Sequence, residues 1–263
     1  MYIERALKKQ LIHFFKMLGE CSQMGAESLK KALMGKIQTK LVLEQLVDIG
    51  IKSVPLIAIT AISTGFVMTL QFGLGLEKYG GKPYVPKVMA LAIFMEIGPV
   101  FTALMCAARI GSGIASVVGS MKVTQQIDAI RVLGSSPIEE IVAPRLVACL
   151  VAFPVLTLIT SFLALASSCV VSTNELGLDP LFFYQKIIDT VTLQEFYSGF
   201  FKSYIFALCV CLPACYYGFH VKEGTEGVGL ATTSSVVVGS ILIFVSDYFM
   251  TKLYWMFEAW KQF

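Results

Sequence analysis

Two acidic residues, Glu96 and Asp247, lie within long apolar stretches, where a charge is costly. A charged side chain near the middle of a membrane span costs roughly 2.5–3.5 kcal/mol, so it is expected to face protein or water rather than lipid. Two interpretations of Glu96 are open: it lines a transport cavity, or it is a protonated or hydrogen-bonded helix-packing residue. For Asp247, a role in lining a path and a role in capping a hydrogen bond are equally open.

Other chemistry is poorly represented in the sequence. No Walker A pattern, G-x-x-x-x-G-K-[ST], occurs, so any ATP used must be hydrolysed by another chain. The two histidines, His13 and His220, are far apart in sequence, which argues against a histidine-based catalytic site. Six of the seven cysteines lie in apolar stretches and are expected to be buried thiols rather than disulfides or metal ligands. We therefore expect a non-enzymatic chain without a cofactor or metal of its own.

The composition is that of a membrane protein. Hydrophobic residues make up 56% and charged residues 15% of the 263 residues, whereas soluble domains carry roughly 25% charged residues. A spanning helix needs about 20 apolar residues, and five such stretches occur, at about 53–76, 88–118, 146–174, 203–221 and 227–251. The sequence thus predicts an all-α, polytopic membrane protein with a transmembrane domain over 53–257. A net charge of +3 gives no reason to expect a nucleic-acid partner.

Residues 1–52 form a separate N-terminal region. Within residues 1–20, apolar side chains recur on one helical stripe, formed by Ile3, Leu7, Leu11, Phe14 and Leu18. The opposite face is largely basic and polar, with Arg5, Lys9, His13, Lys16 and Glu20. This pattern is typical of an amphipathic helix in the membrane interface, and a helix that packs on a partner is the alternative.

The Lys/Arg distribution predicts the orientation. Eight Lys and Arg residues lie within residues 1–40, and the loop at 119–145 adds Lys122, Arg131 and Arg145. Both segments lie on the same side of a five-span protein, so that side is expected to be cytoplasmic. An odd number of spans then places the C-terminus outside. Arg109, near the cytoplasmic end of the second span, is expected to snorkel to the interface.

The loop at 119–145 is expected to have structure of its own. Val123–Leu133 is predicted to be a helix that ends at Gly134, and Ser136-Pro137 begins a second helix that Pro144 closes. Ile127 and Ile130 share one face of the first helix. We expect that face to be buried in a groove of a partner subunit, with Asp128 bonding to its rim. Before this loop, the small residues Gly111, Gly113, Ala115, Ser116 and Gly119 are expected to permit close helix packing.

These segments resemble one known family. Residues 94–137, FMEIGPVFTALMCAARIGSGIASVVGSMKVTQQIDAIRVLGSSP, are similar to the MlaE family of ABC-transporter permeases. Further similar motifs are Gly65-x-Val67 with Gln71, Ala143-Pro144-Arg145, and Gly224-Thr225-Glu226-Gly227-Val228-Gly229. The sequence departs from the family pattern at Gln125, which often is Glu, at Ile130, which often is Leu, and at Val118, which commonly is acidic.

The resemblance implies a homodimeric permease with two cytoplasmic ATPase subunits, which bind ATP and Mg, and an external MCE-domain protein. Such complexes move glycerophospholipids between an inner and an outer membrane. The coupling helix that docks in the ATPase would be formed by Gln126, Ile127, Asp128, Ala129 and Ile130. The lipid would lie near the dimer interface, and Gln71, Glu96 and Asp247 are candidates for its path. A location in a bacterial inner membrane and one in a plastid inner envelope are both compatible with the resemblance.

Two other classes of function are weaker. An intramembrane enzyme would need paired titratable groups at one depth, and Glu96 and Asp247 are the only acids within the predicted spans. An ion-coupled secondary transporter or a membrane scaffold could use Glu96 as a polar intramembrane site. That alternative does not explain why the cytoplasmic loop at 119–145 is structured.

Overall fold

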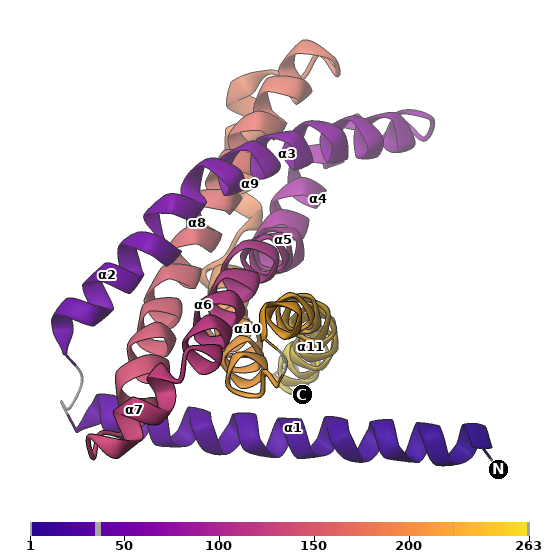
Figure 1. Ribbon diagram of the computed structural model, residues 1–263. Coiled ribbons are helices and arrows are strands. Elements are labelled where there is room, and N and C mark those ends of the chain that lie inside the picture. Colours follow the sequence, from indigo (N-terminus) through magenta and orange to yellow (C-terminus); the bar gives the residue numbers. More distant parts are fainter. Residues whose placement is uncertain (1, 35–37, 223, 262–263) are drawn as a thin grey trace. The chain divides into compact units, whose positions relative to one another are not determined.

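The computed structural model describes residues 2–34, 38–222 and 224–261, without the side chains of residues 2–11 and 13. This part of the chain is helical (Figure 1). Five of its helical segments are long and apolar enough to cross a membrane: Thr39–Glu77, Lys82–Val123, Ile138–Asn174, Leu193–Phe219 and Gly224–Trp260. The predicted all-α, polytopic fold is confirmed. Each segment is longer than the apolar stretch that predicted it, because the helices continue into their polar flanks.

The helical elements are named in chain order. They are α1 (Tyr2–Leu33), α2 (Thr39–Ile49), η1 (Ile51–Ser53), α3 (Val54–Glu77), η2 (Lys82–Tyr84), α4 (Val85–Ala92), η3 (Ile93–Ile97), α5 (Gly98–Cys106), η4 (Ala107–Gly111), α6 (Ser112–Val123), α7 (Gln126–Val132), η5 (Ile138–Val142), α8 (Ala143–Asn174), α9 (Pro180–Thr190), α10 (Leu193–Phe219) and α11 (Gly224–Lys261). The chain forms two compact units. The first comprises Met1–Ile49, Cys106–Val151 and Ala207–Leu242, and the second comprises Gly50–Met105, Ala152–Phe206 and Ile243–Phe263.

Three single turns of π-helix interrupt the spanning segments: η3, η4 and η5. Two of them end two residues before a proline, η3 before Pro99 and η5 before Pro144. Proline lacks an N–H and its ring crowds the preceding turn, so the helix continues there only with a local adjustment, such as a wider π turn. The prediction that Pro144 ends a helix is therefore wrong, because the helix passes through it into α8.

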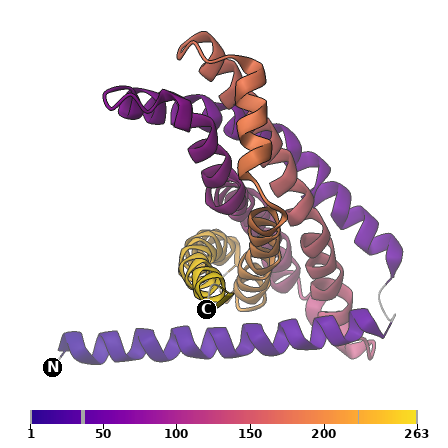
Figure 2. The same ribbon diagram turned by 180° about the vertical axis from the view of Figure 1, so that it is seen from behind.

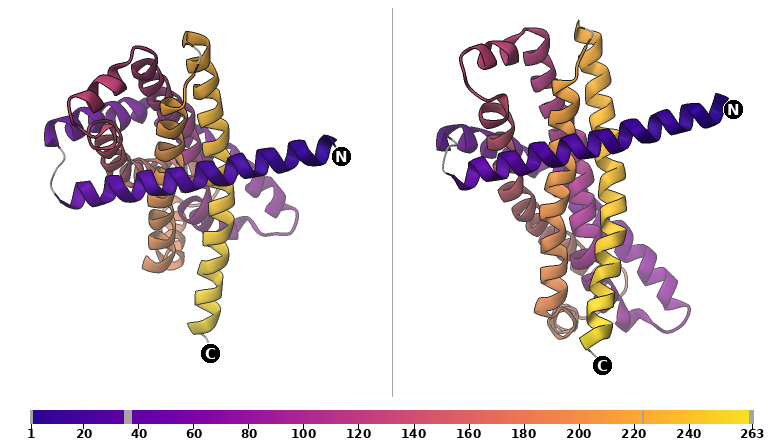
Figure 3. Two further views of the ribbon diagram at one scale, coloured as in Figure 1. Left: turned by 60° about the horizontal axis from the view of Figure 1, so that its bottom comes forward. Right: turned by 90° about the horizontal axis from the view of Figure 1, so that it is seen from below.

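In the first unit, α1 is one straight helix (Figure 3) that extends beyond the predicted segment to Leu33. Of the predicted apolar stripe, Phe14 and Leu18 are half-buried, while Ile3, Leu7 and Leu11 lie outside the described side chains. The fully buried residues of α1 follow a helical stripe: Met17, Cys21, Met24, Gly25 and Ser28.

The contacts of α1 lie within the same unit. A Cβ atom at Gly25 would come within 3.0 Å of Leu212 in α10, and Lys31 Nζ lies 2.6 Å from Glu139 Oε2 in η5. The helix α1 therefore packs on α10 and on the start of the third span. Its position in the membrane interface stays a prediction.

The predicted small-residue contacts are found on one face of η4 and α6. Gly111 is buried near Val210 of α10, and Gly119 is buried against Val221 and Val228. Ala115, between them on the same face, has no exposed surface. Gly113 points away from this face, since a Cβ there would meet no atom within 4 Å.

The second unit contains a core formed by α4, η3 and α8, with buried side chains of Val85, Met89, Ile93, Phe94, Ala164 and Leu165. The helices α3 and α4 form a hairpin whose turn is visible in Figure 2. Gly65 allows α3 to approach α8 closely, because a Cβ there would overlap the carbonyl oxygen of Ala164. One element, α9, was not predicted. Its sequence signal is Asp179-Pro180, where the Asp179 carboxylate accepts a hydrogen bond of 3.0 Å from Phe182 N.

Candidate functional site

Four polar side chains from three helical segments meet inside the second unit. Glu96 lies in η3, the π-helical turn before Gly98-Pro99. Lys202 lies in α10, and Asp247 and Thr251 lie four residues apart on one face of α11. We call these residues the charge cluster. Turns of π-helix often occur at functional sites. Here the π turn η3 contains Glu96, which belongs to the charge cluster.

Lys202 is at the centre of the charge cluster. Its Nζ atom donates hydrogen bonds to Glu96 Oε2 at 2.6 Å and to Thr251 Oγ1 at 2.7 Å. It also lies 2.8 Å from Asp247 Oδ1, an ion-pair contact without the alignment of a hydrogen bond. The Thr251 hydroxyl in turn donates to Glu96 Oε1 at 2.9 Å. The three protons of the ammonium group thus have three oxygen atoms within reach.

The burial of Lys202 explains why its ammonium group needs a carboxylate partner. Its side chain is only 2% exposed, whereas those of Glu96 and Asp247 are 37% and 20% exposed. A buried charge without a partner is strongly destabilising. The two carboxylates and one ammonium carry a net charge of −1 when all three are ionised. Glu96, the most exposed of the three, is therefore the group that a solute or water can reach.

A cavity of about 310 Å³ adjoins Glu96. Apolar and aromatic side chains form much of its wall, and two further carboxylates line it; these residues are Leu91, Ala92, Met95, Glu195, Tyr254, Trp255 and Glu258. Most ligand pockets combine an apolar wall with a few polar groups that orient the ligand. The arrangement suits an amphipathic ligand better than a small ion.

The structure brings together two of the three residues predicted for the substrate path. Glu96 and Asp247 share Lys202, and Glu96 also lines the cavity. Gln71 is exposed on α3 and is neither a described member of the charge cluster nor a residue that lines this cavity.

Lys202 was missed because the fourth span was predicted to begin at Ser203. In the structure this helix begins ten residues earlier, at Leu193, and Lys202 lies well inside it. The sequence nevertheless contained a reason to look for a cation such as Lys202. Glu96 and Asp247 are two carboxylates in apolar segments, and buried carboxylates call for a cation nearby.

The residues predicted to couple to an ATPase lie in the first unit, at the start of α7. This helix spans Gln126–Val132, so it begins three residues later than predicted, and Gly134 follows it with a φ of 80°. Gln125, at the turn before it, also has a positive φ, of 59°. Gln126 and Ala129 are exposed, and Ile130 is half-buried.

Ile127, which is predicted to be buried in a groove of a partner subunit, is 0% exposed within its own chain. The exposed apolar residues of this segment are instead Val132 and Leu133, at 88% and 83%. Asp128 is held by its own chain, with Lys122 Nζ at 3.0 Å and Arg131 Nη1 at 3.5 Å.

Comparisons with known proteins point in one direction. The model of the family described as "Permease MlaE" matches residues 42–253. A Haemophilus influenzae protein described as "Intermembrane phospholipid transport system permease protein MlaE" is 30% identical over 259 residues, with 97% of each chain covered. A Rickettsia felis "Probable ABC transporter permease protein" is 32% identical over 258 residues, which are 96% of this chain and 97% of that one. The Arabidopsis thaliana protein "TRIGALACTOSYLDIACYLGLYCEROL 1, chloroplastic" is 32% identical over 224 residues, which are 85% of this chain and 64% of that protein.

Proposed function

Because this chain belongs to the MlaE permease family, we propose that it moves glycerophospholipids between an inner and an outer membrane. It is a multi-pass membrane protein of the ABC-transporter permease class. In this proposal it makes and breaks no bond itself. The free energy comes from ATP that a separate ATPase subunit binds with Mg and hydrolyses.

The observation that carries the proposal is the charge cluster beside the cavity. Glu96 offers a carboxylate to the polar part of a lipid, and the neighbouring Leu91, Met95 and Trp255 offer apolar surface to its acyl chains. The ion pair with Lys202 holds the Glu96 carboxylate in place without a ligand. A site that is already ordered loses less free energy in binding than a flexible one. The phospholipid in the printed description of the Haemophilus relative supports this choice of substrate.

Coupling to the ATPase is assigned to α7 and the turn after it. The exposed side chains of Ala129, Val132 and Leu133 form the contact surface. Ile127, which is fully buried, fixes this short helix to its own unit. Movement of the docked ATPase would then act on the spanning helices through a rigid contact rather than a flexible loop.

The proposed assembly is a homodimer with two cytoplasmic ATPase subunits and an external MCE-domain protein. Exposed apolar side chains along α11, such as Val237, Ile241, Phe244 and Phe249, need lipid or a second copy of the chain to cover them. The basic N-terminal region and the α7 segment face the cytoplasm, and the C-terminus is external. The host membrane is a bacterial inner membrane or a plastid inner envelope.

One observation favours a second candidate, an ion-coupled transporter. Glu96, Asp247 and Lys202 form a group of three titratable side chains inside apolar helices, as in proton relays. In that case a proton moving through the charge cluster would drive transport, and ATP would have no effect.

Reconstitution distinguishes the two candidates. The permease is purified with its ATPase and MCE partners and placed in vesicles that contain a fluorescent phospholipid, with acceptor vesicles outside. We expect phospholipid transfer to require hydrolysable ATP and to persist when the proton gradient is abolished. Transfer that follows the proton gradient and ignores ATP would replace the proposed function with the ion-coupled one.

A further inference from the structure

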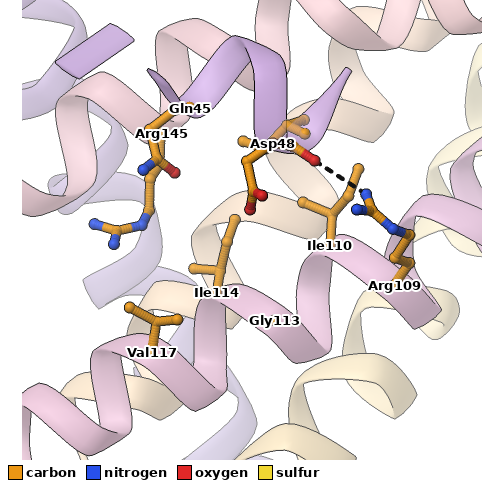
Figure 4. Close-up of a pocket in the computed structure, with 9 residues that line it drawn as sticks. Gln45, Asp48, Arg109, Ile110, Gly113, Ile114, Val117 and Arg145 are labelled. Carbon is orange, nitrogen blue, oxygen red and sulfur yellow. Dashed lines mark hydrogen bonds between the residues drawn. The ribbon is translucent and has the colours of Figure 1, made fainter. Parts of the chain in front are cut away.

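The first unit contains a polar pocket that the proposed transport function does not use. Its volume is about 240 Å³, and it lies between α2, the segment formed by η4 and α6, and the start of α8 (Figure 4). The residues used below are Gln45, Asp48, Arg109, Gly113 and Arg145. Arg109 and Arg145 are 36 positions apart in the sequence.

Both arginines are held by neutral backbone groups. Arg109 Nη1 donates to the carbonyl oxygen of Asp48 at 3.1 Å, and Arg145 Nη1 donates to the carbonyl oxygen of Ile141 at 2.7 Å. These bonds orient the guanidinium groups. A guanidinium group has five N–H donors in a planar fork that matches the oxygen atoms of phosphate. The side chain of Arg109, which is expected to snorkel, is thus held by the carbonyl oxygen of Asp48.

Chain connectivity places this pocket on the N-terminal side of the membrane. Gln45 and Asp48 lie near the start of the first spanning segment, Arg109 and Gly113 in the second half of the second, and Arg145 near the start of the third. These parts are on the same side because successive spans alternate in direction. Each of these segments exceeds the roughly 20 residues that the hydrocarbon core requires, so the pocket can lie at head-group depth.

We propose that this pocket binds the phosphodiester group of a phospholipid from the leaflet on the N-terminal side. Arg109 and Arg145 contact the phosphate oxygens, and the Gln45 amide donates a further hydrogen bond. Drug-sized ligands occupy pockets of about 300–1,000 Å³, so this smaller pocket takes the head group while the acyl chains stay in the bilayer. The proposal requires only that the chain spans a membrane, and it holds whether or not the protein transports lipid.

The side chain of Asp48 also lines the pocket, between Arg145 and Arg109 in the view of Figure 4. Two arginines and one aspartate leave a net charge of +1 in the wall. This charge matches a phosphodiester, which carries one negative charge, better than a phosphate monoester, which carries nearly two at neutral pH. A free inorganic phosphate ion is therefore expected to bind less well than the lipid head group.

The pocket can be tested by charge and by volume. The full-length protein in detergent is titrated with dioctanoyl phosphatidylglycerol, and bound lipid is counted by native mass spectrometry. We expect the wild type to bind one lipid more per chain than Arg145→Gln, whose pocket should bind lipid about tenfold or more weakly. Lipid bound in the cavity beside Glu96 is common to both proteins. Asp48→Asn, which removes the repelling charge, should bind more tightly. Arg131→Gln, which changes an exposed arginine of α7 outside the pocket, should bind as the wild type does.

A second variant fills the pocket without disturbing the helices. A Cβ at Gly113 meets no atom within 4 Å, so Gly113→Leu should fold normally and block the lipid. Gly229→Leu is the matched control, because Gly229 is equally open and lies outside the pocket. Wild-type lipid binding by a folded Arg145→Gln or Gly113→Leu protein would overturn the proposal. Inorganic phosphate that displaces the lipid at equal concentration would show a free-anion site instead.

Discussion

Lys202 and Glu96 are 106 residues apart in the chain, and their side chains form an ion pair of 2.6 Å between Nζ and Oε2. Asp247 lies on the same ammonium group, at 2.8 Å. One buried cation thus organises two acids that are separated by 151 positions in the sequence. The pair joins η3 to α10 and leaves one face of Glu96 toward the adjoining cavity.

The first prediction concerns the stability of this cluster. Lys202→Met should lower the free energy of unfolding by about 3 kcal/mol or more, because removing one member of a buried ion pair leaves the others unpaired. The measurement is the thermal unfolding midpoint in detergent. Lys252→Met is the control, because Lys252 is exposed on α11. Adding Glu96→Gln and Asp247→Asn to Lys202→Met should recover part of the loss, and equal midpoints for Lys202→Met and wild type would contradict this account.

The second prediction concerns ATPase docking. Leu133 is 83% exposed, so Leu133→Asp should release the ATPase and leave the unfolding midpoint unchanged. Loss of an apolar anchor at an interface commonly costs about 2 kcal/mol or more. The measurement is the amount of ATPase that co-purifies with the permease. Leu181→Asp, at an exposed leucine of α9, should retain it.

Ile127→Asp provides the contrast. Because Ile127 is fully buried in its own chain, the new carboxylate would have to enter an apolar environment, and the unfolding midpoint should fall. If Ile127→Asp kept the wild-type midpoint and Leu133→Asp kept the ATPase, α7 would not have the exposed and buried faces described here.

The third prediction concerns the packing of α1. Burial raises the pKa of the Cys21 thiol to about 12, and the charge of Glu20 adds to the effect. At pH 8 only about one thiol in 10,000 is then ionised, and the thiolate is the reactive form. A variant that retains Cys21 alone should react with iodoacetamide far more slowly when folded than in denaturant. Equally fast labelling in both states would show that α1 does not pack on α10.

The fourth prediction concerns topology. Five spanning segments and a basic N-terminal region predict an external C-terminus. A cysteine added after Phe263, in a background without other thiols, should react with a membrane-impermeant maleimide added from outside. Protection from outside together with labelling from the cytoplasmic side would refute the five-span topology.

The fold class was predictable because uncharged stretches of about 20 residues allow few alternatives. The ends of the spans were less predictable, because helices continue into polar flanks once a first turn is formed. That difference hid Lys202, which a boundary at Ser203 excluded from the span. A span predicted to begin at Leu193 would have included Lys202, the cation that pairs with Glu96 and Asp247.

The exposed face of α7 was not predictable either. Helical periodicity shows that Ile127 and Ile130 share a face, but it does not show whether that face meets the chain itself or a partner. In the structure the shared face turns inward at Ile127, and the exposed apolar side chains are those of Val132 and Leu133. Arg109 and Arg145 show the same limit, because only the folded chain places them in one pocket.

Glu96→Gln tests the central claim, that Glu96 in the lipid path takes part in transport. Glutamine keeps the size and one oxygen acceptor for Lys202, but it replaces the oxygen that accepts from Thr251 with an NH2 group and removes the charge that faces the cavity. The measurement is ATP-dependent transfer of fluorescent phospholipid from reconstituted vesicles, divided by the amount of assembled complex. We predict transfer that is roughly tenfold slower, equivalent to about 1.4 kcal/mol in the barrier, with assembly unchanged. Wild-type transfer by Glu96→Gln, and by Glu96→Leu as well, would contradict the claim.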